Sequence, residues 1–219
     1  MTVRLTRAEQ AGRNRALLLA AARTVFLERG YHGASVEQIA DRAGFSTGVV
    51  YSQFGGKADL FLALLEARIA ERAAANAAAV EDLAGDEGMR RLLEHASSVE
   101  RVEPEWGLVV IEFRVHAARD PKLGARYSAL HQRTLAGVER AIAGVYDRAG
   151  EPSPLPSAEL ARLVVAVGAG ARLEQAAGPD PDAATRLARL LAQLIAQRPA
   201  PRRPAEGTRQ PAEEGGGDQ

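Results

Sequence analysis

The stretch that decides the fold runs from Ser35 to Phe54 and reads SVEQIADRAGFSTGVVYSQF. Ser35 and Gln38 have the spacing of a capping box, which predicts the start of a helix. Gly44 predicts the end of that helix, because glycine tolerates the positive φ of a C-terminal cap. Ala40 is small enough for two steeply crossing helices to touch. The stretch therefore predicts two short helices joined by a tight turn.

The second of these helices, expected over about residues 47–54, has little outward bulk. Its polar or small residues Thr47, Gly48, Ser52 and Gln53 fall on the side away from Val50. A helix of this kind fits closely into the major groove of DNA, which makes the pair a candidate helix-turn-helix. The bare pattern also fits a helical hairpin inside a bundle.

The sequence around this stretch is helical almost throughout, and we see no convincing strand. Apolar residues recur at helical spacing over Arg13–Arg29, and Gly30 predicts the end of that helix. A long helix is expected from Lys57 into the low eighties. Further helices are expected over residues 89–102, 106–118, 120–149, 157–177 and 180–197, with Ser157 as a cap. The fold class predicted is all-α, with about nine helices.

Composition narrows the class of protein. The 219 residues hold 28 basic and 28 acidic side chains and no cysteine, which excludes disulfides, thiolate metal sites and cysteine nucleophiles. No apolar stretch reaches the roughly 18 residues of a membrane span, and Met1–Gln10 is polar, so we expect a cytoplasmic protein with no membrane partner. Residues 1–60 carry eight basic and five acidic side chains, with the excess at Met1–Arg15, where an arm could reach phosphates.

The first third of the chain resembles the DNA-binding domain of the TetR (tetracycline-repressor) family of regulators. The most specific element is the run Tyr51-x-x-Phe54-x-x-Lys57, which reads YSQFGGK. The other matching positions are Phe26, Gly30-Tyr31, Ser35-Val36, Ile39-Ala40, Ala43-Gly44, Ser46, Gly48, Asp59-Leu60 and Phe61. The resemblance implies a helix-turn-helix domain over 12–72 (motif 35–54) and a helical effector-binding and dimerisation domain over 73–198. Residues 199–219, rich in proline and glycine, are expected to be a disordered tail.

The resemblance also assigns roles on the DNA side. Tyr51 and Lys57 fall where the family contacts operator phosphates, and Ser35 can donate to a phosphate from a helix N-terminus. Thr47 is the best candidate for reading a base. The expected DNA-binding residues are Ser35, Ser46, Thr47, Gly48, Val49, Tyr51, Ser52 and Lys57.

An effector pocket is expected among the middle helices. The candidate lining residues are Trp106, Phe113, His116, Tyr127, His131 and Tyr146, with Glu112 and Arg114 as further polar candidates. Each of these side chains fits ordinary packing or surface exposure as well. No cofactor, metal or catalytic residue is expected.

A dimer interface is expected on the last two helices, which the family pairs across a two-fold axis as a four-helix bundle. Its candidate residues are Leu160, Leu163, Val164, Val167, Gly168, Ala171, Leu187, Leu191 and Leu194. The same apolar stripes could instead fill the core of one subunit.

The sequence thus predicts a DNA-binding transcriptional regulator: a homodimeric repressor that a small-molecule effector releases from a palindromic operator. One alternative is a helical small-molecule-binding adaptor with no DNA role. The other is an all-α enzyme, although no metalloprotease motif or phosphate loop is present, and Glu112 and His116 form a common helical pair.

Overall fold

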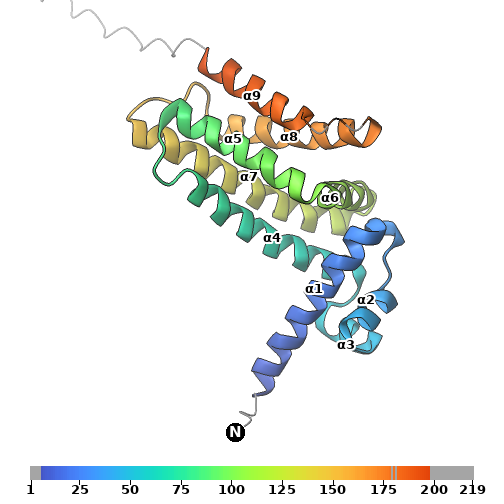
Figure 1. Ribbon diagram of the computed structural model, residues 1–219. Helices are drawn as coiled ribbons and strands as arrows, with labels where there is room; N and C mark the ends of the chain where they lie inside the picture. Colours follow the sequence, from blue (N-terminus) through green and yellow to red (C-terminus); the bar gives the residue numbers. More distant parts are fainter. Residues whose placement is uncertain (1–5, 179, 181, 198–219) are drawn as a thin grey trace, which may run out of the picture.

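The computed structural model describes residues 6–178, 180 and 182–197, and this part of the chain forms nine α-helices and no strand (Figure 1). The predicted tail, residues 199–219, lies outside the described residues. The helices are α1 (Arg7–Gly33), α2 (Val36–Ala43), α3 (Thr47–Phe54), α4 (Lys57–Ala79), α5 (Gly85–Val102), α6 (Pro104–Ala117), α7 (Pro121–Ala149), α8 (Ser157–Ala177) and α9 (Ala183–Ala196). The predicted all-α fold is confirmed.

The helix-turn-helix forms through the local signals that predicted it. The Ser35 hydroxyl accepts a hydrogen bond from the Gln38 backbone N–H at 3.3 Å, and the Gln38 side chain accepts one from the Ser35 N–H at 3.1 Å. Gly44 closes α2 in the left-handed conformation, with φ 73° and ψ 30°. Local hydrogen bonding therefore fixes both ends of α2 without help from distant residues.

Several helix starts differ from the prediction, since α5 begins at Gly85, not Met89, α6 at Pro104, not Trp106, and α9 at Ala183, not Asp180. Helix α1 begins at Arg7, not near Arg13, because Thr6 and Glu9 form a capping box of their own. Helix α8 begins at Ser157 itself, so Ser157 is not its cap; Pro156 holds that position and makes no side-chain capping bond. At Gly30, φ of 70° and ψ of 177° interrupt α1 one turn before its end, where the sequence predicted the helix to stop.

The buried side chains form two cores that share α4. The first joins α1, α2, α3 and the first half of α4 to α6 and the start of α7. The second joins the C-terminal end of α4 to α5, α7, α8 and α9. The predicted boundary between residues 72 and 73 falls inside α4, so one continuous helix links the two regions.

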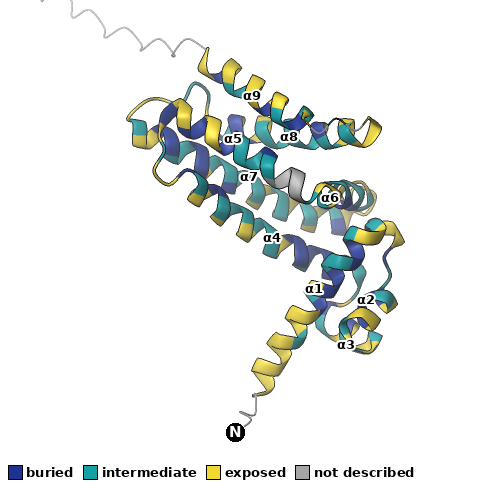
Figure 2. Ribbon diagram, viewed as in Figure 1, coloured by how far each residue is buried: buried dark blue, intermediate teal, exposed yellow. Residues whose placement is uncertain are grey.

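The helix-turn-helix and the α8–α9 pair lie at opposite ends of the molecule (Figure 1). The first turns of α1 project beyond the body and are largely exposed, whereas its second half is buried against α4 and α6 (Figure 2). No helix in the described part of the chain combines the length and the apolar character of a membrane span.

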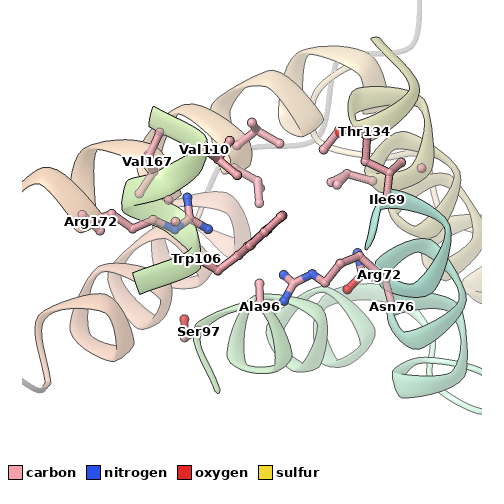
Figure 3. Close-up of a pocket in the computed structure, with 18 of the residues that line it drawn as sticks. Ile69, Arg72, Asn76, Ala96, Ser97, Trp106, Val110, Thr134, Val167 and Arg172 are labelled. Carbon is pink, nitrogen blue, oxygen red and sulfur yellow. The ribbon is translucent and has the colours of Figure 1, made fainter. Parts of the chain in front are cut away.

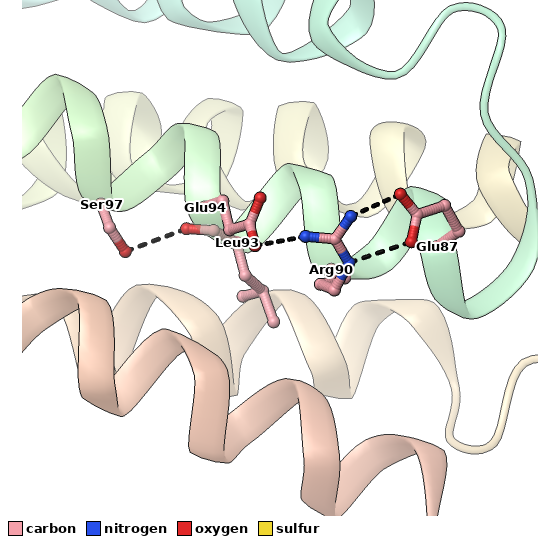
Figure 4. A network of polar contacts seen from close by, with 5 residues as sticks. All are labelled: Glu87, Arg90, Leu93, Glu94 and Ser97. Carbon is pink, nitrogen blue, oxygen red and sulfur yellow. Dashed lines mark hydrogen bonds and ion pairs between the residues drawn. The ribbon is translucent and has the colours of Figure 1, made fainter.

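Helix α5 carries an ionic ladder on its outer side (Figure 4). Arg90 pairs with both Glu87 and Glu94, one turn away on either side. These side chains are exposed, so the pairs contribute little to stability. Farther along α5, the buried Ser97 hydroxyl donates to the Leu93 carbonyl at 3.0 Å, which satisfies its polar atom.

Candidate DNA-binding surface and internal cavity

Helix α3 presents one face to solvent at the end of the molecule. Val50 and Phe54 are buried in the first core, and Gly48, Tyr51 and Ser52 are exposed on the other side. The Tyr51 side chain is 53% exposed, which is unusual for a tyrosine beside a well-packed core. Its hydroxyl is therefore accessible to a partner outside the protein.

The other predicted DNA contacts differ in how far they are exposed and in whether their side chains already form hydrogen bonds. Thr47 and Val49 are half-buried, and Ser46 is exposed at the start of α3 without a side-chain capping bond. The Ser52 hydroxyl donates to the Val49 carbonyl at 2.9 Å. Ser35 is half-buried; its N–H donates to the Gln38 side chain and its hydroxyl oxygen accepts from the Gln38 N–H, so both groups take part in the α2 cap.

Lys57 makes hydrogen bonds within the protein. Its ammonium donates to the carbonyls of Tyr31 and Ala34, both at 2.9 Å, and lies 4.6 Å from the centre of the Tyr31 ring. Burial lowers the pKa of Lys57. Two of its three protons thus tie α4 to the α1–α2 turn, and a phosphate contact would share the same group.

Arg15 belongs to the basic N-terminal segment that the sequence offered as a phosphate-contacting arm, and it lies in α1 against the end of α3. Its guanidinium lies 4.4 Å from the centre of the Phe54 ring, at the end of α3. The side chain is exposed, so a positive charge stands at the C-terminal end of α3, on the side where Phe54 is anchored. An arginine far along a helix from the motif gives no local signal of this contact.

A junction between α1 and α6 follows from the interruption at Gly30. The Glu112 carboxylate accepts a hydrogen bond from the Tyr31 backbone N–H at 2.7 Å. A Cβ on residue 30 would stand 2.8 Å from the same carboxylate, so only glycine leaves room for it. A side chain from α6 therefore caps the break in α1.

Two predicted pocket residues belong to this junction and do not line a cavity. The Phe113 ring is fully buried, with its centre 4.9 Å from that of Tyr31 and 4.4 Å from that of Phe61. The His116 ring lies 5.2 Å from the Tyr31 ring. Both side chains pack α6 onto α1.

A cavity of about 250 Å³ lies among α4, α5, α6, α7, α8 and α9 (Figure 3). Three predicted pocket residues, Trp106, Tyr127 and His131, line it. Tyr146 does not, because it is buried in the second core with its hydroxyl donating to Asp86 at 3.3 Å. Most of the remaining wall is aliphatic.

A cluster around Arg114 forms part of the cavity wall. Its guanidinium lies 3.3 Å from the His131 ring nitrogen and 5.9 Å from the centre of the Tyr127 ring. Burial, followed by the charge of Arg114, lowers the pKa of His131. Burial raises the pKa of Tyr127. Both side chains are therefore uncharged at neutral pH.

The predicted dimer residues include exposed, buried and cavity-lining side chains, and some belong to more than one of these sets. Leu163, Leu187 and Leu194 are exposed, as are Leu173 and Leu190, and Leu194 is 68% exposed. Leu160 is fully buried in the second core. The residues of the list that line the cavity are Val164, Val167, Gly168, Ala171, Leu187 and Leu191. Helices α8 and α9 thus carry an apolar outer face as well as an inner one.

No group of three or more histidine, aspartate or glutamate side chains within the described ranges is arranged to hold a metal ion.

Comparisons with known proteins match both regions. Residues 18–64 match the family model of bacterial regulatory proteins of the tetR family, and residues 85–199 match that of the C-terminal part of BetI-type transcriptional repressors. The chain is 47% identical over 66 residues to the transcriptional activator FasR of Mycolicibacterium smegmatis, covering 30% of this chain and 28% of FasR. It is 34% identical over 118 residues to the transcriptional repressor AcnR of Corynebacterium efficiens, covering 54% and 57%. The chain therefore spans less than two thirds of either curated relative.

Solved structures extend the likeness over the whole fold. The regulator FadR from Bacillus subtilis, solved in complex with stearoyl-CoA, matches with a TM-score of 0.68 and 16% identity, covering 83% of this chain and 97% of that one. At this identity the likeness shows the fold.

Proposed function

Because the chain belongs to the tetR family of bacterial regulatory proteins, we propose that it binds a palindromic operator as a homodimeric repressor and releases it when a small molecule enters the cavity. Its general role as a DNA-binding transcriptional regulator follows from the family, which is not one of enzymes. A regulator of this kind acts on the chromosome, so we place it in the cytoplasm.

The observation that carries the proposal is the outward face of α3. Gly48, Tyr51 and Ser52 share one exposed side of a short helix whose other side is anchored in the first core. Gly48 and Ser52 on this face are small, so the helix backbone beside them can approach base edges closely. Tyr51 would hold a phosphate at the rim, with Thr47 directed at a base.

The apolar face of α8 and α9 supports the dimer. Five large leucines are exposed there, at the end of the molecule opposite α3. Exposed leucines gathered on neighbouring helices mark an association surface more often than a free one. A two-fold pair would present two copies of α3 to the half-sites of a palindrome, about 34–36 Å apart.

Release of the operator would follow from a shift between two arrangements of this pair. Helix α4 starts at Lys57 beside the helix-turn-helix and lines the cavity near its other end. A small molecule that binds one orientation of α4 more tightly would change the spacing of the two α3 helices. Equal spacing of the α3 helices with and without the effector would rule out this mechanism.

The test is a selection from a randomised DNA duplex library on the purified protein. We expect one short palindrome to be enriched, and a Tyr51→Ala variant to lose it, because Tyr51 is exposed and its removal leaves the core intact. Thr47→Ala should change the preferred base instead. A protein that enriches no sequence in the absence of effector would contradict the proposed repressor.

A salt titration separates DNA binding from an adaptor role. The logarithm of the operator affinity should fall linearly with the logarithm of the salt concentration, and each lost phosphate contact should flatten the slope by about one unit. Lys57→Ala should weaken binding to all sequences alike. Its folded fraction must be measured too, because Lys57 also bonds two backbone carbonyls.

A further inference from the structure

Two buried polar side chains of the described part of the chain, Asn76 on α4 and Ser97 on α5, both line the cavity. Each is 6% exposed. A polar group that is removed from water is costly unless it finds a hydrogen-bond partner. The bonding state of these two residues therefore indicates what the cavity offers to a ligand.

The two residues differ in how their polar atoms are satisfied. The Ser97 hydroxyl donates to the Leu93 carbonyl at 3.0 Å. The side-chain oxygen of Asn76, Oδ1, has no hydrogen-bond partner. A buried acceptor without a partner raises the free energy of the folded protein, so a ligand that donates a hydrogen bond there gains affinity.

The surroundings of Asn76 are close-packed and offer it no hydroxyl. Figure 3 shows its side chain extending from α4 at the edge of the cavity. Helix α7 packs closely beside it, since a Cβ on Gly137 would stand 3.4 Å from that of Ala73. Thr134, which lines the cavity from α7, donates its hydroxyl proton to the Leu130 carbonyl at 3.3 Å. A donor for Asn76 is therefore expected to come from a ligand.

The arginines of the wall interact within the protein or are exposed to water. Arg68, Arg72 and Arg172 each interact with other residues of the chain, and Arg114 and Arg133 are exposed. Their charges are thus balanced or hydrated without a ligand. An uncharged molecule enters such a cavity at a lower desolvation cost than an ion does.

The volume of the cavity limits the size of the ligand. A dry apolar cavity of about 150 Å³ holds one benzene molecule. On the same scale, the cavity of about 250 Å³ holds about ten non-hydrogen atoms. Its wall presents aliphatic side chains from four helices, among them Ile69, Val110, Val167 and Leu191, so the body of the ligand is apolar.

We propose that this cavity binds an uncharged molecule of about ten non-hydrogen atoms, with an apolar body and a hydroxyl or N–H group that donates to Oδ1 of Asn76. The inference rests on the proposed function, in which the cavity holds the effector, and it names the effector's chemical class. The aliphatic wall contacts the body, and Asn76 selects for the donor.

The test compares two isomers on DNA-free protein, 1-octanol and methyl heptyl ether. The alcohol carries a hydrogen-bond donor that the ether lacks. Isothermal titration calorimetry measures both affinities. Trp106, the one tryptophan of the chain, lines the cavity, so a shift of its emission shows that binding occurs there. We expect the wild-type protein to bind the alcohol about fivefold more tightly, the gain of one neutral hydrogen bond.

Two variants identify the residue responsible. Asn76→Leu removes the acceptor at nearly constant volume and should abolish the preference for the alcohol. Ser97→Ala, the matched control, removes the other buried polar group of the wall, whose hydroxyl is already bonded, and should keep the preference. Equal affinity of the wild-type protein for the two isomers, or a preference that survives in Asn76→Leu, would overturn the proposal.

Ions of the same chain length test whether the ligand is uncharged. Octanoate and octylammonium should both bind more weakly than 1-octanol, and tighter binding of either ion would contradict the proposed class. Because no DNA is present, these results stand apart from operator binding. A protein that prefers the alcohol but selects no operator would refute the repressor and keep the ligand class; one that selects an operator but binds neither isomer would do the reverse.

Discussion

The helix-turn-helix region and the α5–α9 region are both built of α-helices, but the first presents an exposed helix face and the second encloses a cavity. In the first, a capping box and the left-handed Gly44 fix the two ends of α2, and the outward face of α3 carries Gly48, Ser52 and the exposed Tyr51. In the second, the helices enclose a cavity and expose leucines on α8 and α9. The difference teaches that a surface which must fit DNA is built by local rules, whereas a cavity is built by side chains distant in sequence.

The two regions meet at Phe61, which gives the largest expected effect. Its ring is fully buried and contacts the rings of Phe26, Tyr31, Trp106 and Phe113. Phe61→Ala should lower the free energy of unfolding by about 3–5 kcal/mol, the usual cost of a cavity left by a buried aromatic ring. Urea denaturation followed by circular dichroism and by Trp106 fluorescence measures the loss.

The matched control for Phe61 lies in the second core. Ile142, also fully buried, contacts no α1–α3 residue of the first core cluster, and Ile142→Val should cost about 0.5–1.5 kcal/mol. Because Trp106 packs against the first core, a Phe61→Ala variant that lost Trp106 structure at low urea but kept a later circular dichroism transition would show that the two regions unfold independently, and the shared role of α4 would be disproved.

The next largest effect is expected on self-association. Leu194→Glu should weaken self-association at least about a hundredfold, which corresponds to about 2.7 kcal/mol, because it buries a charge in the proposed interface. Val115, 52% exposed on α6, provides the control Val115→Glu. Sedimentation velocity measures both; a variant at 194 that associates like wild type would place the interface elsewhere.

The hydrogen bond between Glu112 and Tyr31 tests how the helix-turn-helix region is held to the rest of the chain, because it joins α6 to α1. Glu112→Leu leaves the buried Tyr31 N–H without an acceptor, and we expect a loss of about 2 kcal/mol. Glu112→Gln keeps an oxygen at that place and should recover most of the stability. Amide hydrogen exchange at Tyr31 should accelerate in the leucine variant alone, and equal exchange in both variants would mean that the carboxylate does not hold α1.

The sequence predicts best what neighbouring residues decide. Ser35, Gln38 and Gly44 lie within ten positions of one another, so their bonds follow from short-range rules. Glu112 lies 81 residues from Tyr31, and no local pattern announces their bond. The same distance explains why Phe113 fitted a pocket in the sequence but packs against α1 in the structure.

The positions of charged side chains are equally hard to predict from sequence, because they also depend on contacts between distant residues. Arg72 and Asn76 fall on one side of α4, but a lone arginine on a helix fits a solvated surface equally well, and only the packing of α8 against α6 brings Arg172 to the same cavity. For Lys57 the family resemblance points to a phosphate contact, and the folded chain also uses the ammonium to hold Tyr31 and Ala34.

The smallest expected effect compares one tyrosine from each core. Burial and the charge of Asp59 raise the pKa of Tyr31 to about 12, and burial and Asp86 raise the pKa of Tyr146 to about 12. An unfolded tyrosine ionises near pH 10, so the stability that each neutral phenol contributes is complete below pH 10 and is lost as the pH rises towards 12. Between pH 9 and pH 11 each should cost about 1.4 kcal/mol.

Tyr31→Phe and Tyr146→Phe should each make that loss smaller by the same amount, because phenylalanine does not ionise; urea denaturation at the two pH values and one protein concentration measures it. Equal increments would mean that each core feels the ionisation through global unfolding of the whole chain. An increment at Tyr146 alone would mean that the first core opens locally before the second unfolds. The two regions would then differ in cooperativity as well as in the way their sequences specify them.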